Sequence, residues 1–180
     1  MVKWAMQLLS KRLQQLRKDK EGSLAIEMVI GMLMMLMVFC LLMDILILTW
    51  KFSVIGQTNS YLARTASTQG GVLGTAPQGF PGGNMAYVDS NEMRNTVQAR
   101  FAAAGIMPGD YQILINGRNI TNGGTTGEID YLTPFNTEIR VQYRWDFVNN
   151  IIPGQLRHTI SSERVTMSEF KYRYDSWVGE

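Results

Sequence analysis

Glu27 has the clearest chemical potential in this chain, because it is a carboxylate at the start of a long apolar segment. Gly22 and Ser23 precede it, and residues 28–43 after it carry no charge. A carboxylate is costly in hydrocarbon, so one at this position is a functional hypothesis whose partner must be named. If the chain is cut between Gly22 and Ser23, the new α-amino group can supply the opposite charge. The alternative is a carboxylate that is stabilised only by the positive end of the helix dipole.

Asp44 is a second acid, at the far end of the apolar segment. It follows Glu27 by 17 residues, which is about 25 Å along an α-helix. We expect it either at the outer headgroup boundary or against a basic group of a partner subunit. The methionines between the two acids predict adaptable packing against lipid or other helices, with thioether ligation of copper as the sharper alternative. Cys40 is expected to be a small buried hydrophobe, and a single cysteine allows no intramolecular disulfide.

The apolar segment predicts one membrane span, and the charges around it predict an orientation. Six basic and two acidic residues precede Ser23, whereas basic and acidic residues balance after Lys51. The positive-inside rule therefore places the N-terminus in the cytoplasm and the C-terminal part outside. A cleaved secretory signal fits poorly, because the apolar run exceeds the usual ~7–15 residues and no small-x-small site follows it. A plain signal anchor remains an alternative.

The span continues into a helix that is too long to lie wholly in lipid. We expect this helix from about Leu24 to Ser67, or about 65 Å, roughly twice the hydrocarbon thickness. Trp50 and Lys51 suit the outer interface, and an amphipathic pattern follows them. The residues expected on its buried face are Phe52, Ile55, Asn59, Leu62 and Ala66.

Five segments follow from these patterns. They are a basic amphipathic leader over 1–22, the transmembrane half of the long helix over 23–50, its extramembrane half over 51–68, a Gly-rich loop over 69–88, and an outer αβ domain over 89–180.

The outer domain predicts a second helix and a small antiparallel sheet. Asp89 and Glu92 form a possible capping box, and Gly105 ends the helix. Its apolar stripe consists of Met93, Val97, Phe101 and Ala104. Strands are expected over 111–115, 138–147 and within 156–174. Asn116-Gly117 forms a hairpin turn, and a bulge or break lies near Ser168-Glu169. The predicted fold class is α+β, with a long N-terminal transmembrane helix that continues into this domain.

Catalysis has little support in the sequence, and we expect no enzyme, metal or cofactor. His158 is interpreted as a surface residue, and no Cys/His cluster could hold zinc. The Gly-rich run 123–127 lacks the Lys of a phosphate-binding loop. Arg140 and Arg144 alternate with acids, which indicates a solvated mixed face and no nucleic-acid partner.

Residues 20–66 resemble the type IV prepilins, and most closely the TadE-like minor pilins of tight-adherence pili. Members of that branch tend to read Gly-Ala-Val-Ala-Val-Glu-Phe before the apolar run, and this chain has Gly-Ser-Leu-Ala-Ile-Glu-Met from Gly22. Asp44 matches their second acid, and residues 61–66 resemble their Ala/Arg-rich helix end. Ser23 stands where the major pilins commonly have Phe, and the segment around Leu33 lacks their Pro.

The resemblance implies cleavage after Gly22 by a prepilin-type aspartyl peptidase, with Glu27 pairing with the Ser23 ammonium of a neighbouring subunit. It implies a pilin-like architecture and a minor pilin or pseudopilin subunit of a pilus-like or export apparatus. The partners would be the lipid bilayer, the peptidase, and other pilin-like subunits or assembly platform proteins. The location would be the bacterial cytoplasmic membrane or a surface pilus. The alternatives are an uncleaved single-pass extracytoplasmic binding module and, less well supported, an exported enzyme.

Overall fold

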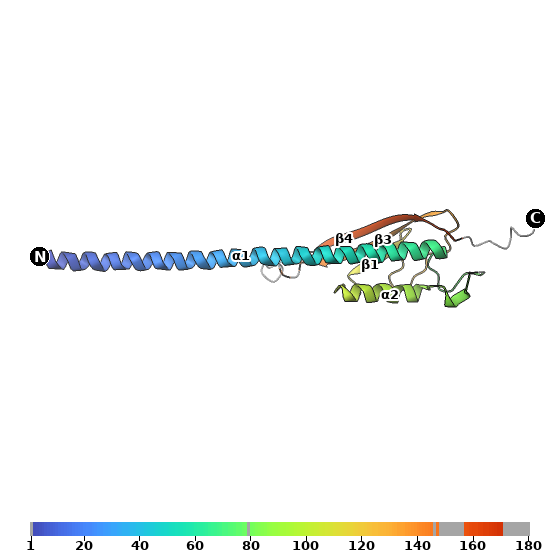
Figure 1. The fold of residues 1–180 in the computed structure, drawn as a ribbon, viewed down its shortest axis with the longest axis horizontal. Helices are drawn as coiled ribbons and strands as arrows, with labels where there is room; N and C mark the ends of the chain where they lie inside the picture. The colour runs from blue at the N-terminus through green and yellow to red at the C-terminus, as the bar shows by residue number, and fades with distance from the viewer. Residues whose placement is uncertain (1, 79, 146, 148–156, 171–180) are drawn as a thin grey trace, which may run out of the picture. The chain divides into compact units, whose positions relative to one another are not determined.

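A long N-terminal helix dominates the structure, which is a computed structural model that describes residues 2–78, 80–145, 147 and 157–170. This helix, α1, comprises Val2–Gln69 (Figure 1). The sequence predicted a helix start near Leu24, but the leader and the apolar segment form one continuous helix. The reason is local: residues 17–24 contain neither Pro nor a β-branched side chain, and the single Gly22 does not break a helix.

Two glycines end α1 close to the predicted position. Gly70 has a φ of 69°, in the left-handed region that glycine tolerates best. The N–H of Gly71 donates to the carbonyl of Ala66 at 2.8 Å, so one of the last helical carbonyls is satisfied.

The described residues divide into two compact units, and α1 contributes to both. The first unit contains α1 up to Ile45, together with Phe147. The second, which we call the outer unit, contains Leu46–Trp145 and residues 157–170.

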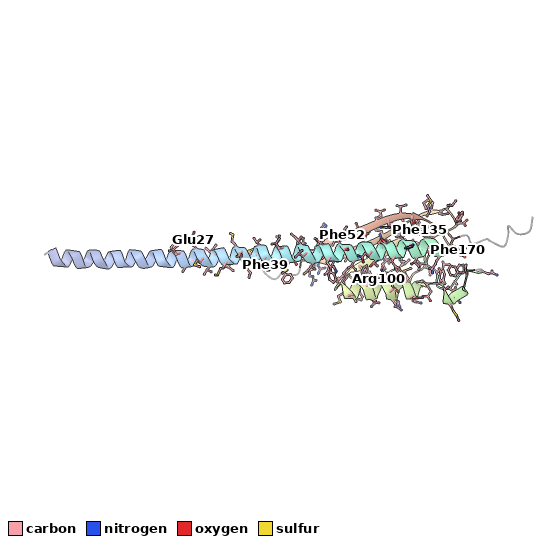
Figure 2. The ribbon with its side chains drawn as sticks, viewed as in Figure 1. Glu27, Phe39, Phe52, Arg100, Phe135 and Phe170 are labelled. Atoms are coloured by element: carbon pink, nitrogen blue, oxygen red, sulfur yellow. The ribbon has the colours of Figure 1, made fainter. Side chains whose placement is uncertain are left out.

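In the first unit, the apolar side chains of α1 project outward on all sides. Figure 2 shows this from Glu27 to beyond Phe39. Phe39 is 59% exposed, and its apolar neighbours from Leu24 onward are similarly open. Among the described residues, Gly22–Gln69 includes one stretch long and apolar enough to cross a membrane, with a mean hydropathy of 2.6. This finding fits a single-pass membrane protein.

The second helix, α2, comprises Ser90–Ala103, and Asp89 caps its start as predicted, without the return bond from the Glu92 side chain that a full capping box has. The side chain of Asp89 accepts hydrogen bonds from the N–H groups of Asn91 and Glu92, at 2.8 and 2.7 Å. Because these N–H groups have no partner within a helix, the cap stabilises the first turn by about 1 kcal/mol. The predicted stripe of Met93, Val97, Phe101 and Ala104 is buried, as expected.

Within the described residues, four antiparallel strands form a sheet in the order β2-β1-β3-β4. Their bounds are Tyr111–Ile115 for β1, Arg118–Asn119 for β2, Pro134–Arg144 for β3 and Arg157–Met167 for β4. Asn116 and Gly117 form the predicted β1–β2 turn, with φ values of 49° and 74°. The layout is therefore α+β, with a long apolar helix, a second helix and a small sheet.

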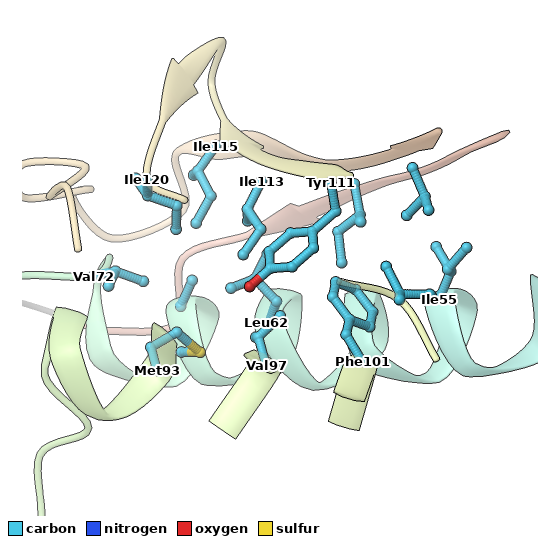
Figure 3. Packing of buried hydrophobic residues seen from close by; sticks show 14 of the residues in the cluster. Ile55, Leu62, Val72, Met93, Val97, Phe101, Tyr111, Ile113, Ile115 and Ile120 are labelled. Atoms are coloured by element: carbon cyan, nitrogen blue, oxygen red, sulfur yellow. The ribbon is translucent and has the colours of Figure 1, made fainter. Parts of the chain in front are cut away.

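The core of the outer unit lies where α1, α2 and one face of the sheet meet. Figure 3 shows Leu62 of α1, Val97 and Phe101 of α2, and Tyr111 of β1 turned toward one another. The rings of Phe101 and Tyr111 pack edge to face, with centroids 4.7 Å apart. Fully burying an aliphatic side chain stabilises a fold by about 1.5–3 kcal/mol, so this three-layer contact supplies most of the driving force.

The predicted buried face of α1 is right at four positions and wrong at Phe52, which is 54% exposed. One residue earlier, the ammonium of Lys51 lies over the ring of Tyr143, 5.3 Å from its centroid. This turn of α1 therefore meets the sheet through its lysine and not through its phenylalanine.

β3 begins and ends earlier than predicted. The sequence placed this strand over 138–147, and its alternation is right, because Ile139, Val141 and Tyr143 are buried. Phe147, expected to be the last inward side chain, is 42% exposed and lies beyond the strand. Its N–H donates to the carboxylate of Asp44 and not to a neighbouring strand.

β4 ends at Met167, close to the predicted break. Ser168 is fully buried, and its hydroxyl donates to the carbonyl of Ile129 at 2.8 Å. Val165 and Met167 lie on the outer face, while Phe170 packs on Phe80 with ring centroids 5.5 Å apart. The predicted connection over 149–154, Tyr172 and Tyr174 lie outside the described residues.

The Gly-rich loop contains a short 3-10 turn, Gly83–Met85, and is tied to the rest of the outer unit through Tyr87. The hydroxyl of Tyr87 accepts from the N–H of Leu73 at 2.9 Å and donates to the carbonyl of Gly71 at 3.3 Å. Burial raises the pKa of Tyr87 above its ordinary value of 10.0, and the charge of Asp89 adds to this, while the Leu73 N–H acts in the opposite direction.

Tyr87→Phe should lower the free energy of unfolding of the outer unit by about 1–3 kcal/mol at neutral pH, because the N–H of Leu73 loses its acceptor. The raised pKa means that the folded state holds this proton more tightly than the unfolded chain. Its stabilisation is therefore complete below pH ~10 and is lost as the pH rises above that value. Urea unfolding followed by near-ultraviolet circular dichroism at pH 7 and pH 11 should show a smaller alkaline loss for the variant than for the wild type. An equal loss in both proteins would contradict the assignment.

Candidate functional site

The predicted processing site lies inside α1. Gly22, Ser23 and Glu27 all have helical backbone, so Ser23 and Glu27 are one helical turn apart and share a face. Apart from its chain neighbours and the backbone of its own helix, nothing lies within 4 Å of the position that a Cβ on Gly22 would occupy.

Glu27 is exposed on a helix whose neighbouring side chains are apolar. Ile26 and Met28, on either side of it, are 63% and 66% exposed. Within the described residues, the carboxylate of Glu27 has no hydrogen bond or ion pair, so the chain itself does not neutralise it there. In water the exposed carboxylate is solvated and needs no partner, but in hydrocarbon an isolated carboxylate requires a partner or a proton.

Asp44 differs from Glu27, because it is completely buried although Met43 and Ile45 are 40% and 41% exposed. Its Oδ1 accepts a hydrogen bond from the N–H of Phe147 at 3.2 Å, across 103 positions of sequence. From the sequence, Asp44 was predicted to lie either at the outer headgroup boundary or against a basic group of a partner subunit. The structure provides a donor from the chain segment after β3, within the same unit. A hydrogen bond to a charged acceptor is stronger than one between neutral groups.

The methionines in the apolar segment of α1 lie on the surface of the helix. Met28, Met35 and Met43 are all exposed. Cys40 is half-buried, and His158 is exposed on β4. No group of three or more His, Cys, Asp and Glu side chains within the described ranges could hold a metal ion.

The predicted solvated face of the sheet is present. Arg140 and Glu138 form a salt bridge, with Nε and Oε1 2.6 Å apart, and Arg140 also lies near the charge of Glu163. The hydrogen bond and the charge of Glu138 raise the pKa of Arg140 further above its ordinary value.

A groove between α1 and β4 was not predicted from the sequence. It has a volume of about 420 Å³, and we call it the α1–β4 groove. Its polar walls include Ser60, Arg64, Ser67 and Thr68 from α1, and Arg164 and Glu169 from the other side. The α1 wall could have been predicted from the spacing of Ser60, Arg64 and Thr68, because residues four apart lie on one face of a helix. The contribution of β4 depended on a register that the sequence alone does not determine.

Comparisons with protein families, with curated proteins and with solved structures give no match for this chain. Its candidate sites therefore have to be interpreted from their own geometry and chemistry.

Asp44→Ala should make the amide proton of Phe147 exchange faster with solvent, by about tenfold or more, because its charged acceptor is removed. Asp44→Asn keeps an acceptor oxygen and should have a smaller effect. The measurement is hydrogen exchange of the full-length protein in detergent micelles, with Glu27→Ala as the matched loss of a carboxylate elsewhere on α1. Unchanged protection of Phe147 in Asp44→Ala would show that this hydrogen bond does not hold the segment.

Proposed function

We propose that this chain is a pilin-like subunit, a minor pilin or pseudopilin, of a pilus-like or export apparatus. In this proposal a prepilin-type peptidase removes the residues up to Gly22, and the subunit assembles through the remainder of α1. The observation that carries the proposal is the position of Glu27. It is an exposed carboxylate, without a partner among the described residues, at the fifth position after Gly22 on a helix able to span a membrane.

The chemistry of assembly follows from that carboxylate. Cleavage creates an ammonium group at Ser23, four residues from Glu27. In a bundle of such helices, the Glu27 of one subunit neutralises the Ser23 ammonium of its neighbour. Opposite charges attract strongly where water is excluded, so the pair sets the axial position of one helix against the next.

The exposed apolar surface of α1 supports the same proposal. Side chains such as Leu33 and Leu36, at 57% and 56% exposure, are not buried by any other described part of the chain. Lipid covers them before assembly, and neighbouring helices cover them afterwards. The subunit would reside in the bacterial cytoplasmic membrane, with its N-terminus in the cytoplasm because of the basic leader, and would move from there into the apparatus. Its role would be structural and not enzymatic.

The second candidate function is an uncleaved, membrane-anchored binding module with the outer unit outside the cytoplasm. The α1–β4 groove favours it, because a polar concavity of this size suits a ligand. The two candidates differ in the fate of the leader, so the first experiment separates them.

Coexpression with a prepilin peptidase should shorten the chain so that it begins at Ser23, and intact mass should fall by the mass of residues 1–22. Gly22→Leu should block the cut, because a large side chain replaces the small residue before the scissile bond. Gly31→Leu is the matched control, since Gly31 also lies in α1 and has open space around it. A mature protein that keeps Met1 or Val2 beside an active peptidase would favour the anchored binding module.

Glu27→Ala should leave cleavage, membrane insertion and folding of the outer unit intact, but reduce incorporation into the assembly. Removing one member of a buried ion pair leaves the other charge uncompensated, typically at a cost of about 3–5 kcal/mol. Glu27→Gln keeps the size but not the charge, and should be intermediate or equally defective. The measurement is the fraction of subunit in sheared or purified assemblies at equal expression and processing.

Wild-type incorporation of Glu27→Ala would refute the charge-pairing account. Insertion itself should be unharmed or improved, because the substitution removes a charge from the lipid-facing helix.

A further inference from the structure

The α1–β4 groove has firmly connected walls. The hydroxyl of Ser67 donates to the carbonyl of Met167 at 2.5 Å, and the N–H of Glu169 donates to the carbonyl of Ser67 at 2.9 Å. Further along, the side-chain amide of Asn59 donates to the carbonyl of Ser162 at 2.9 Å. Helix and strand are thus joined on both sides of the groove, which fixes the spacing of its two walls.

Two arginines give the groove its chemical character. Arg64 comes from α1 and Arg164 from β4, and both side chains are exposed. Within the described part of the chain, neither guanidinium forms a hydrogen bond or an ion pair, in contrast to Arg140 with its Glu138 partner. Among the described lining residues the one acid is Glu169, so these residues give the groove an excess of positive charge.

The hydroxyl groups of the α1 wall are already used as donors. Ser60 donates to the carbonyl of Gly56 at 2.8 Å, and Thr68 to the carbonyl of Arg64 at 3.1 Å. Ser67 donates to β4, as described above. These hydroxyl protons are therefore not available to a ligand, and recognition of a ligand depends mainly on the two guanidinium groups. A guanidinium binds a carboxylate through two parallel hydrogen bonds, which favours an oxyanion as the occupant.

Among the described residues, β4 is the edge strand of the sheet beside the groove. The carbonyl of Asn136 accepts a hydrogen bond from the N–H of Asn116, so the backbone groups of Asn136 point toward β1. Backbone groups of successive residues in a strand point to opposite sides, so those of Thr137 point toward β4. Thr137 pairs with Arg164, so the backbone groups of Glu163 and Val165 point away from the sheet. An edge with unpaired N–H and C=O groups can accept an extended chain as a further strand.

We infer that the α1–β4 groove binds an extended, acidic segment of a neighbouring polypeptide. A carboxylate of that segment pairs with Arg64 and Arg164, and its backbone pairs with the free edge of β4 at Glu163 and Val165. The volume of about 420 Å³ exceeds what one carboxylate fills, which leaves room for the flanking residues of such a segment. The inference rests on the proposed function only in taking the neighbour to be another subunit of the apparatus.

The test uses a fluorescent hexaglutamate peptide and the uncleaved full-length protein in non-ionic micelles at low salt, with binding measured by fluorescence anisotropy. The double variant Arg64→Gln/Arg164→Gln should lower the affinity for the peptide by about tenfold or more, because charge-assisted hydrogen bonds are lost. Each single variant should be intermediate. Arg64→Lys/Arg164→Lys keeps the charge but loses the two-pronged geometry and should recover binding only in part.

Arg144→Gln is the matched control. Arg144 is also exposed and forms no ion pair with an acid among the described residues, but it lies on β3 with its side chain on the outer face of the sheet. It should leave the affinity unchanged. An equal loss in Arg144→Gln, or no loss in the double variant, would overturn the assignment of the groove.

Two further measurements examine the occupant. Val165→Pro removes an N–H of the free edge without removing one from the β3–β4 ladder, so the outer unit should fold while the peptide binds more weakly. Full affinity in a folded Val165→Pro variant would exclude strand pairing. Inorganic phosphate that displaces the peptide as readily as unlabelled hexaglutamate would indicate a small-anion site and overturn the peptide assignment. Because cleavage plays no part in these measurements, they can fail or succeed independently of the processing experiment.

Discussion

The outer unit depends on one face of α1, because the sheet and α2 both close on it. Ile55, Leu62 and Ala66 on this face have no exposed surface, and each joins the common core. Asn59 lies among them, fully buried, and its amide binds carbonyls of β3 and β4. Apolar burial supplies the energy of the contact, whereas the amide specifies its register, since a shift along the helix would leave these polar groups buried without partners. Its Oδ1 lacks a partner even so, a cost that a single buried amide brings to an otherwise apolar face.

The two acids of α1 illustrate how the same functional group obtains different roles from its surroundings. Asp44 is enclosed and bound by the chain that follows β3, so it acts within the molecule. Glu27 is exposed among apolar side chains and has no such donor within the described residues. A carboxylate that the chain satisfies contributes to the chain's own structure, whereas one that the chain leaves open is available for a contact between molecules.

Local signals predicted the features that depend on neighbouring residues. The cap at Asp89, the turn at Asn116-Gly117 and the α+β layout all follow from short patterns, and the structure confirms them. The errors concern tertiary pairing. Phe52 fits the helical period but is exposed, and β3 stops before Phe147, whose N–H binds Asp44. The α1–β4 groove needs a helix stripe and a strand about 100 residues apart, and no local pattern reports that they meet. The processing site and the role of Glu27 remain predictions.

The hydrogen bonds that join α1 to β4 also have a consequence for the time course of synthesis. The hydrogen-bond partners of Asn59 and Ser67 are 103 and 100 residues later in the chain, so they are synthesised later. At about 5–20 residues per second, the ribosome needs roughly 5–20 s to make that stretch. During this interval the apolar face with Ile55 and Leu62 has been made, but its covering strand has not. The nascent chain thus exposes an apolar helix face on the side where the outer unit will fold. A chaperone acting there would have to recognise α1 before β4 has been synthesised.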